Sequence, residues 1–238
     1  MEDQFKDQEI LLEQNSSVSR SFVANVFSWM TFGLAVTAIV SYVFAHSSLI
    51  ELIISPTGGL SILGWIVTIA PFGFILAMNL GYQKWSATGI TALFIAFAIV
   101  MGMSLSTIFL RYTGTSIVTT FAIASSTFAV MAVLGHTTKT DLTKFGSLLY
   151  MALIGIVIAM VVNWFMQSSG LDMIISILGV LIFTGLIAYD TQKIKRIGAG
   201  VEYGSSSAKK LAILGATSLY LDFVNLFLFL LRLLGGRN

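Results

Sequence analysis

The sequence predicts an all-α membrane protein with seven transmembrane helices, and its composition and the spacing of its charges carry that prediction. Of 238 residues, 56% are hydrophobic and only 10% are charged, and the mean hydropathy is +0.91. An ordinary soluble domain carries roughly 25% charged residues. The charges leave six gaps of 17 to 32 residues and a final apolar stretch with one charge. Since a helix needs about 20 mostly apolar residues to cross the bilayer core, most gaps are long enough for one crossing.

Each gap is interpreted as one helix, because lipid offers the backbone no hydrogen bonds and the alternation of a barrel strand is absent. The predicted spans lie near residues 22–45, 60–79, 86–110, 116–135, 147–167, 172–190 and 211–233. The alternative is six full spans followed by a C-terminal segment that enters the membrane and returns. The apolar run at 226–231 favours a complete seventh crossing.

Small residues indicate where two of these helices approach a neighbour closely. On the third span Ala98, Gly102 and Ser106 recur every four positions, and on the fifth span Gly155 and Ala159 do the same. We therefore expect both faces to pack against other helices.

The charge distribution predicts the orientation. Ten Lys and Arg residues lie on the side of the N-terminus and three on the other side, so the positive-inside bias makes the N-terminus cytoplasmic. Residues 1–20 form an acidic cytoplasmic tail, and residues 21–238 form a single polytopic transmembrane domain. The formal net charge of +2 excludes an electrostatic grip on nucleic acid, and zero cysteines exclude disulfides and thiolate metal sites.

Asp222 is the charge that the topology does not explain. It lies 12 residues after Lys210 and 10 before Arg232, which at ~1.5 Å per residue puts it near the middle of the membrane. Carboxylates there are costly and mark functional sites. The alternative is a neutral structural carboxyl that is hydrogen-bonded between helices.

Asp190 is the second candidate, at the end of the sixth span. It lies three residues before Lys193, about 5 Å inside the boundary, and the alternative is an interfacial aspartate paired with that lysine. If Asp190 and Asp222 meet, two carboxylates in a low dielectric cannot both ionise comfortably and titrate as a unit. Such a pair is a proton switch, although the depth count places Asp222 roughly 13 Å deeper and opposes the contact.

Calcium is the ion that this arrangement could serve, as a ligand or as a permeant. Calcium takes six to eight oxygen ligands. Asn225 shares a helix face with Asp222, and Asp190, backbone carbonyls and water could complete a shell. No other cofactor is expected, and the remaining partners are the lipid bilayer and protons.

Three motifs resemble the Bax inhibitor-1/YccA family, on its bacterial side. They are Gly135-His-Thr-Thr-Lys139-x-Asp141-Leu142, Ala188-Tyr189-Asp190-Thr-Gln-Lys193 and Leu219-Tyr-Leu-Asp222-Phe-Val-Asn225-Leu-Phe-Leu. The similarity extends from about Ala24 to Arg237. It implies a bacterial inner-membrane protein in which six helices wrap around a central C-terminal helix. It also implies a pH-dependent calcium leak sensed by an aspartate pair, which falls on Asp190 and Asp222, with Tyr189 and Asn225 as supporting residues.

One departure from the family pattern concerns the gate. Some relatives carry an Arg at the inner end of the second helix that latches onto the aspartate of the sixth. Here that region reads Asn79-Leu-Gly-Tyr-Gln-Lys84-Trp. Lys84 can replace the Arg as a point charge but not as a bidentate partner.

Two other functions compete with the leak. Relatives are associated with suppression of cell death and with modulation of a membrane-bound protease, so the chain could be a non-transporting regulator with a membrane-protein partner. An intramembrane aspartyl protease also presents two aspartates on neighbouring spans. Its Gly-x-Gly-Asp and Pro-Ala-Leu motifs are absent, and the only prolines are Pro56 and Pro71, so we do not expect an enzyme.

Overall fold

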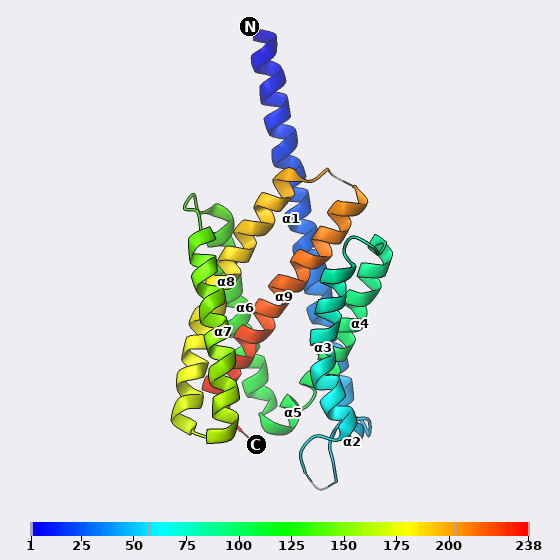
Figure 1. Cartoon of the computed structure of the whole chain (residues 1–238), viewed down its shortest axis with the longest axis vertical. Coiled ribbons are helices and arrows are strands. Elements are labelled where there is room, and N and C mark those ends of the chain that lie inside the picture. Colours follow the sequence, from blue (N-terminus) through cyan, green and yellow to red (C-terminus); the bar gives the residue numbers. More distant parts are fainter. Residues whose placement is uncertain (1, 57, 203, 238) are drawn as a thin grey trace. The chain divides into compact units, whose positions relative to one another are not determined.

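The computed structural model is helical along nearly its whole length (Figure 1). It describes the backbone of residues 2–56, 58–202 and 204–237, and the side chains of these residues from Ser19 onward. The helices are α1 (Glu2–Ala45), α2 (Ile50–Ile53), α3 (Ile62–Gly81), α4 (Ala87–Leu105), α5 (Ile108–Arg111), α6 (Gly114–Thr137), α7 (Thr143–Met166), α8 (Ser169–Gly200) and α9 (Ser206–Leu234). The predicted acidic tail, residues 1–20, lies almost entirely outside the residues whose side chains are described.

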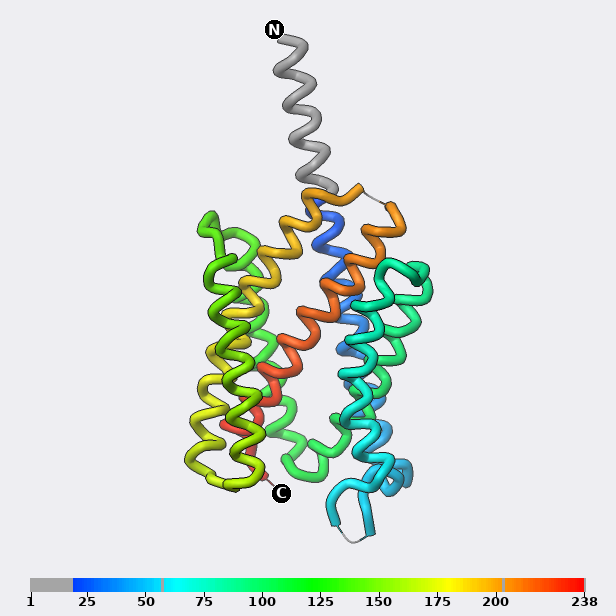
Figure 2. The backbone as a smooth tube through the Cα atoms, viewed as in Figure 1, coloured from blue at the N-terminus to red at the C-terminus, as the bar shows by residue number. Residues whose placement is uncertain are grey.

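Seven segments of the described chain are long and apolar enough to cross a membrane, which confirms the predicted fold class. They are Ser19–Ala45, Ile62–Gly81, Ala87–Arg111, Gly114–Thr137, Thr143–Met166, Ser169–Gly200 and Ser206–Leu234. The last is a single helix of 29 residues, long enough to span at 1.5 Å per residue, and Figure 2 traces it without a break. The structure therefore favours seven crossings over a returning C-terminal segment.

The chain divides into two compact units, Met1–Thr107 with Lys193–Thr217, and Ile108–Gln192 with Ser218–Asn238. In the first unit α4 packs against both α1 and α3. The hydroxyl of Thr37 on α1 donates to the carbonyl of Ala98 at 2.8 Å. A Cβ on Gly102 would lie 2.7 Å from the Cβ of Val40. The predicted small-residue face of the third span is thus a close helix contact.

In the second unit α6, α7 and α8 lie alongside one another (Figure 1). The N-terminal end of α8 is joined to the C-terminal end of α9 by an ion pair between Asp172 and Arg232 at 3.1 Å. One helical turn before that arginine, Phe229 stacks on Phe183 of α8 with ring centroids 5.8 Å apart. Gly179 leaves room for this ring, since a Cβ there would lie 2.6 Å from it.

The C-terminal helix α9 is the most buried of the candidate spans. Its most apolar window is 67% buried, whereas the other six range from 11% to 44%. A helix that the others surround must be more buried than they are, so this burial agrees with the predicted central position of the seventh helix. The wrapping of all six other helices around it stays a prediction.

The structure corrects three details of the predicted elements. The third span is interrupted at Ser106, where α4 ends before the short α5. The Ser106 hydroxyl donates to the carbonyl of Met103 at 2.6 Å, and such local bonds compete with the helical pattern.

The second correction concerns the fifth span, α7. Its face at Gly155 and Ala159 was expected to pack closely against another helix, but Gly155 is exposed and a Cβ there would meet nothing within 4 Å.

The third correction concerns the sixth span, which was predicted to end at residue 190. Helix α8 continues to Gly200. Beyond Asp190 the side chain of Ile194 and the position of Gly198 are buried, whereas Lys193 and Arg196 are exposed. The helix continues because this segment keeps one face for packing, although its charges mark the edge of the apolar stretch.

Candidate functional site

The first predicted site residue, Asp190, lies within helix α8 rather than at its end. Ten residues of helix follow it, and its side chain is only 3% exposed. Lys193, its expected interfacial partner, is exposed and forms no ion pair with any residue that the structure describes. Asp190 is therefore a buried carboxylate inside a helix, and the expected ion pair with Lys193 is not formed.

Two glycines bring the neighbouring helices close to this part of α8. Gly135 near the end of α6 lies against the carbonyl of Ala188, and Gly146 near the start of α7 lies against the ring of Tyr189. A Cβ at either glycine would collide with these atoms. The motif Ala188-Tyr189-Asp190 is thus enclosed by α6 on one face and by α7 on another.

Tyr150 on α7 joins the cluster and was missed from the sequence. Its hydroxyl donates to Oδ1 of Asp190 at 3.4 Å, and its ring meets the ring of Tyr189 edge to face at 6.0 Å. Its only sequence signal is its position four residues after Gly146, which places both on the α7 face that meets α8.

The second aspartate, Asp222, lies on α9 and is 5% exposed. The next residue, Phe223, packs edge to face on two aromatic rings of α6, with centroids 5.3 Å from Phe121 and 5.7 Å from Phe128. These contacts fix the rotation of α9 about its axis beside the aspartate. Asp222 lies in the same unit as Asp190, and the meeting of the two carboxylates stays a prediction.

Gln192 fastens the chain between α6 and α7 to the same stretch of α8. Its amide nitrogen donates to the carbonyl of Thr140 at 2.8 Å, and its amide oxygen accepts the backbone N–H of Leu142 at 2.9 Å. Leu142 is the residue at the N-cap of α7 and has no capping side-chain bond of its own. The glutamine therefore positions the start of the helix that carries Tyr150.

Asn225 and Lys84 were predicted to support the aspartates, but in the described part of the chain neither forms a hydrogen bond or an ion pair with Asp190 or Asp222. The side chain of Asn225 donates to the carbonyl of Leu221 in its own helix at 2.8 Å. Lys84 is exposed in the turn between α3 and α4, in the first unit. Their roles as an ion ligand and as a latch stay predictions.

This cluster contains only two aspartates, which are too few to hold a resident metal ion by themselves. Among the residues that the structure describes, no group of three or more His, Cys, Asp or Glu side chains is placed to hold a metal. A shell for calcium would need backbone carbonyls, amide oxygens and water besides the two aspartates, since the ion takes six to eight oxygens.

Comparison with known proteins decides the family. A family model described as the inhibitor of apoptosis-promoting Bax1 matches residues 19–238. The chain belongs to the Bax inhibitor-1 family. The resemblance of the three sequence motifs is thereby confirmed, and the match includes both aspartates and Tyr150.

Bacterial relatives of this Bax inhibitor-1 family chain match it along nearly its full length. A protein of Borreliella burgdorferi is 43% identical over 226 residues, which cover 95% of this chain and 96% of the relative. The inner membrane protein YbhL of Escherichia coli is 42% identical over 221 residues, covering 92% of this chain and 93% of YbhL. A Rickettsia prowazekii protein is 41% identical over 222 residues, covering 92% and 91%. The chain is a multi-pass membrane protein of this family.

Proposed function

We propose that this protein is a pH-sensitive calcium leak channel of the bacterial inner membrane, gated by Asp190 and Asp222 through a shared proton. The single observation that carries the proposal is that both aspartates, which lie in the same unit, are almost fully buried. The inner-membrane location is supported by the name of the relative YbhL and by the seven apolar helices.

The gating step follows from the cost of burying charge. Two carboxylates in a low dielectric repel each other when both are ionised, so one proton is retained between them. The shared proton holds α8 and α9 together. When it is lost at higher pH, the two charges repel each other or recruit a cation. The leak is therefore expected to increase as the pH rises.

Calcium suits this arrangement as a permeant ion. A channel needs sites that attract an ion but also release it. Two carboxylates supply charge without the complete oxygen shell that would trap calcium. Since protons and calcium compete for the same oxygens, the affinity for calcium rises with pH.

The test is calcium flux in liposomes that contain the full-length protein and a calcium-sensitive dye, measured against pH. The variants are Asp190→Asn, Asp222→Asn and the double variant. Wild type should show more flux as the pH rises, and the double variant should lose that dependence. Asp172→Asn is the matched control, because it removes a carboxylate of α8 that pairs with Arg232 at the helix end. Its flux should keep the dependence on pH.

Two outcomes would contradict the proposal in different ways. Equal flux for wild type and the double variant at every pH would remove the sensor role of the aspartates. The absence of flux from wild type at all pH values would remove the channel itself. Tight association of that inactive protein with another membrane protein would then favour the non-transporting regulator.

A further inference from the structure

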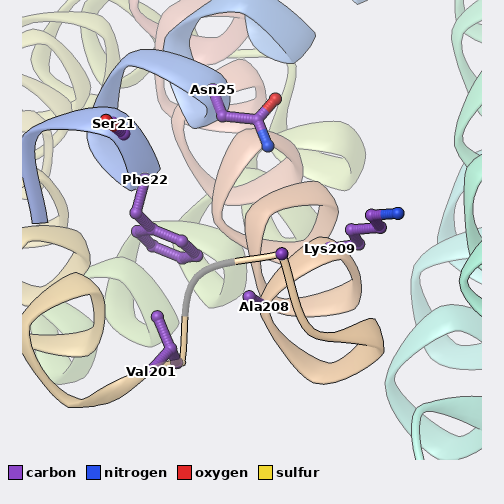
Figure 3. Close-up of a pocket in the computed structure, with 7 residues that line it drawn as sticks. Ser21, Phe22, Asn25, Val201, Ala208 and Lys209 are labelled. Atoms are coloured by element: carbon purple, nitrogen blue, oxygen red, sulfur yellow. The ribbon is translucent and has the colours of Figure 1, made fainter. Parts of the chain in front are cut away.

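A cavity of about 390 Å³ lies in the first unit, beside the turn that joins α8 to α9 (Figure 3). Figure 3 shows the ring of Phe22 pointing toward that turn, while the side chains of Ser21 and Lys209 point away from each other. Because a ligand site needs polar groups that converge, these side chains do not form one. The C-terminal end of α9, in the second unit, makes directed contacts instead.

The chain that follows α9 lies against the start of α6. Gly236 forms two hydrogen bonds there. Its carbonyl accepts the backbone N–H of Thr113 at 3.1 Å, and its own N–H donates to the hydroxyl oxygen of Ser116 at 2.9 Å. All three residues belong to the second unit, so these bonds fasten two of its helices to each other.

The segment that makes these bonds is joined to α9 without slack. The N–H of Gly235 still donates to the carbonyl of Leu231 at 2.9 Å, in the helical pattern. Gly235 lies against the ring of Tyr112, since a Cβ there would lie 2.7 Å from that ring. Arg237 forms an antiparallel bridge with Tyr112. We call residues 235–237 the clasp, and its position determines the position of the end of α9.

Ser116 is the side chain on which the clasp depends. Its hydroxyl oxygen accepts a second hydrogen bond, from the hydroxyl of Thr113 at 2.9 Å. The backbone N–H of Ser116 donates to the hydroxyl oxygen of Thr113 at 3.3 Å and thereby caps α6. Replacing Ser116 by Ala therefore removes the acceptor for Gly236 but keeps the capping bond, because that bond uses only the backbone of residue 116.

The clasp extends a contact that runs along α6 and α9. The rings of Phe223 and Phe227 on α9 meet the ring of Phe121 on α6, with centroids 5.3 and 6.1 Å apart. Two turns further along α6, Phe128 meets Phe223 at 5.7 Å. The aromatic rings and the clasp together hold α9 on α6 from its C-terminal end to the residue beside Asp222.

The clasp opposes movement of α9 in a way that the aromatic contacts do not. Apolar contacts are non-directional, whereas hydrogen bonds weaken steeply when their geometry changes. A helix with a fastened end cannot slide along its axis or turn about it unless the fastening opens. Gly236 and Arg237 are exposed, so water competes for the hydrogen bonds of the clasp and the clasp can open.

The leak proposed above requires α8 and α9 to separate when their shared proton is lost. We propose that the closed clasp restrains α9 and thereby limits the calcium leak, and that opening the clasp increases the leak. This inference rests on the proposed function and adds a regulatory element at the end of the helix that carries Asp222.

The first test locks the clasp with a disulfide in a double variant, Ser116→Cys with Gly236→Cys. The chain has no cysteine of its own, so no other disulfide can form within one molecule. A Cβ on Gly236 would lie 3.2 Å from the hydroxyl oxygen of Ser116, which suits a bond whose two Cβ atoms lie about 3.8 Å apart. Gly236 does not have a positive φ, so its backbone accepts a cysteine.

Calcium flux is measured in liposomes that contain the full-length double variant, before and after reduction. The oxidised form is expected to leak at least about twofold less than the reduced form, because the disulfide prevents the opening that loss of one hydrogen bond allows. The two single cysteine variants are the matched controls. Their flux should not respond to the reductant.

The second test opens the clasp with Ser116→Ala. At a pH below the wild-type midpoint this variant is expected to leak roughly two- to tenfold more, the factor that corresponds to one lost hydrogen bond. Ser126→Ala is the matched control on α6, because Ser126 is exposed and its hydroxyl donates to the carbonyl of Ala122 in its own helix. Hydrogen exchange gives a readout without flux: amides in the last turn of α9 should exchange faster in Ser116→Ala and not in Ser126→Ala.

The outcomes separate this inference from the proposed function. If wild type leaks but the oxidised and reduced double variants leak equally, with the disulfide verified by mass spectrometry, the restraint is overturned and the channel stands. If no disulfide forms, the clasp itself is overturned. A wild type without leak would overturn the proposed function and the effect of the clasp on it, and the exchange rates would still show whether the clasp holds α9.

Discussion

The hydroxyl of Tyr150 on α7 donates to a carboxylate oxygen of Asp190 on α8 at 3.4 Å. The ring of the same tyrosine meets the ring of Tyr189 on α8 edge to face, with centroids 6.0 Å apart. Tyr150 thus ties α7 to α8 at Asp190, and its hydroxyl is a further candidate member of the proposed sensor. This link can be removed without touching either aspartate.

Replacing Tyr150 by Phe is expected to shift the pH of half-maximal leak, because it removes the hydroxyl that donates to Asp190 at 3.4 Å. Calcium flux against pH in liposomes measures the shift. Tyr42→Phe on α1 is the control and should leave the midpoint unchanged. An unshifted midpoint in Tyr150→Phe would show that the phenol does not act on the sensor.

Replacing Gly135 by Ala is expected to destabilise the protein. The new methyl group would collide with the carbonyl of Ala188, so α6 and α8 must separate, and overpacking of this kind costs about 1–3 kcal/mol. Thermal unfolding in detergent should show a lower Tm. Gly155→Ala is the matched control, since its methyl group would enter open space. Its Tm should be unchanged or slightly higher, because Ala is the better helix former. Equal Tm values for the two variants would contradict the close contact.

Replacing Gln192 by Met is expected to loosen the start of α7. Methionine keeps the length of the side chain but removes both hydrogen bonds to the backbone of Thr140 and Leu142. Hydrogen exchange should show faster exchange of the Leu142 amide, and the loss of stability should be about 1–3 kcal/mol. Gln83→Met changes an exposed glutamine and should alter neither quantity. Unchanged protection of Leu142 would contradict the role of Gln192.

The seven helices could be predicted because charges are expensive inside a bilayer, so their absence along the chain marks the spans. The same reasoning failed at α8, because charge marks the membrane edge but not the end of a helix. Ile194 stays buried on one face while Lys193 and Arg196 point outward, and the helix continues to Gly200. To predict such an extension, one must follow the apolar residues along one face of the helix instead of the average hydropathy of the whole segment.

The candidate site was predictable only in its charged members. Asp190 and Asp222 stood out because buried carboxylates in spans are rare. Tyr150 did not, because a tyrosine in an apolar span has no distinctive pattern, and its contact with Asp190 depends on the close approach of α7 at Gly146. Gln192 was part of a family motif, but its bonds to Thr140 and Leu142 join positions about 50 residues apart. Spacing along the chain does not reveal such a pair.

Lys210 shows that a basic residue near a membrane edge can have a structural role besides setting orientation. Its ammonium group donates to the carbonyl of Tyr82 at 2.7 Å and to that of Trp85 at 3.3 Å, and it lies 4.9 Å from the centre of the Tyr82 ring. Both carbonyls lie just beyond the end of α3, where backbone acceptors lack helical partners and a cation is favoured by the helix dipole.

Replacing Lys210 by Met is therefore expected to lower the Tm, with a loss of about 1–2 kcal/mol, because the apolar stem is kept and only the charged donor is removed. Lys144→Met is the control, since Lys144 is exposed and forms no hydrogen bond or ion pair with a described residue. High salt should reduce the difference only partly, because the donor is half-buried against its acceptors and screening acts mainly on exposed charges. If the two variants unfolded at the same temperature, Lys210 would contribute to orientation alone.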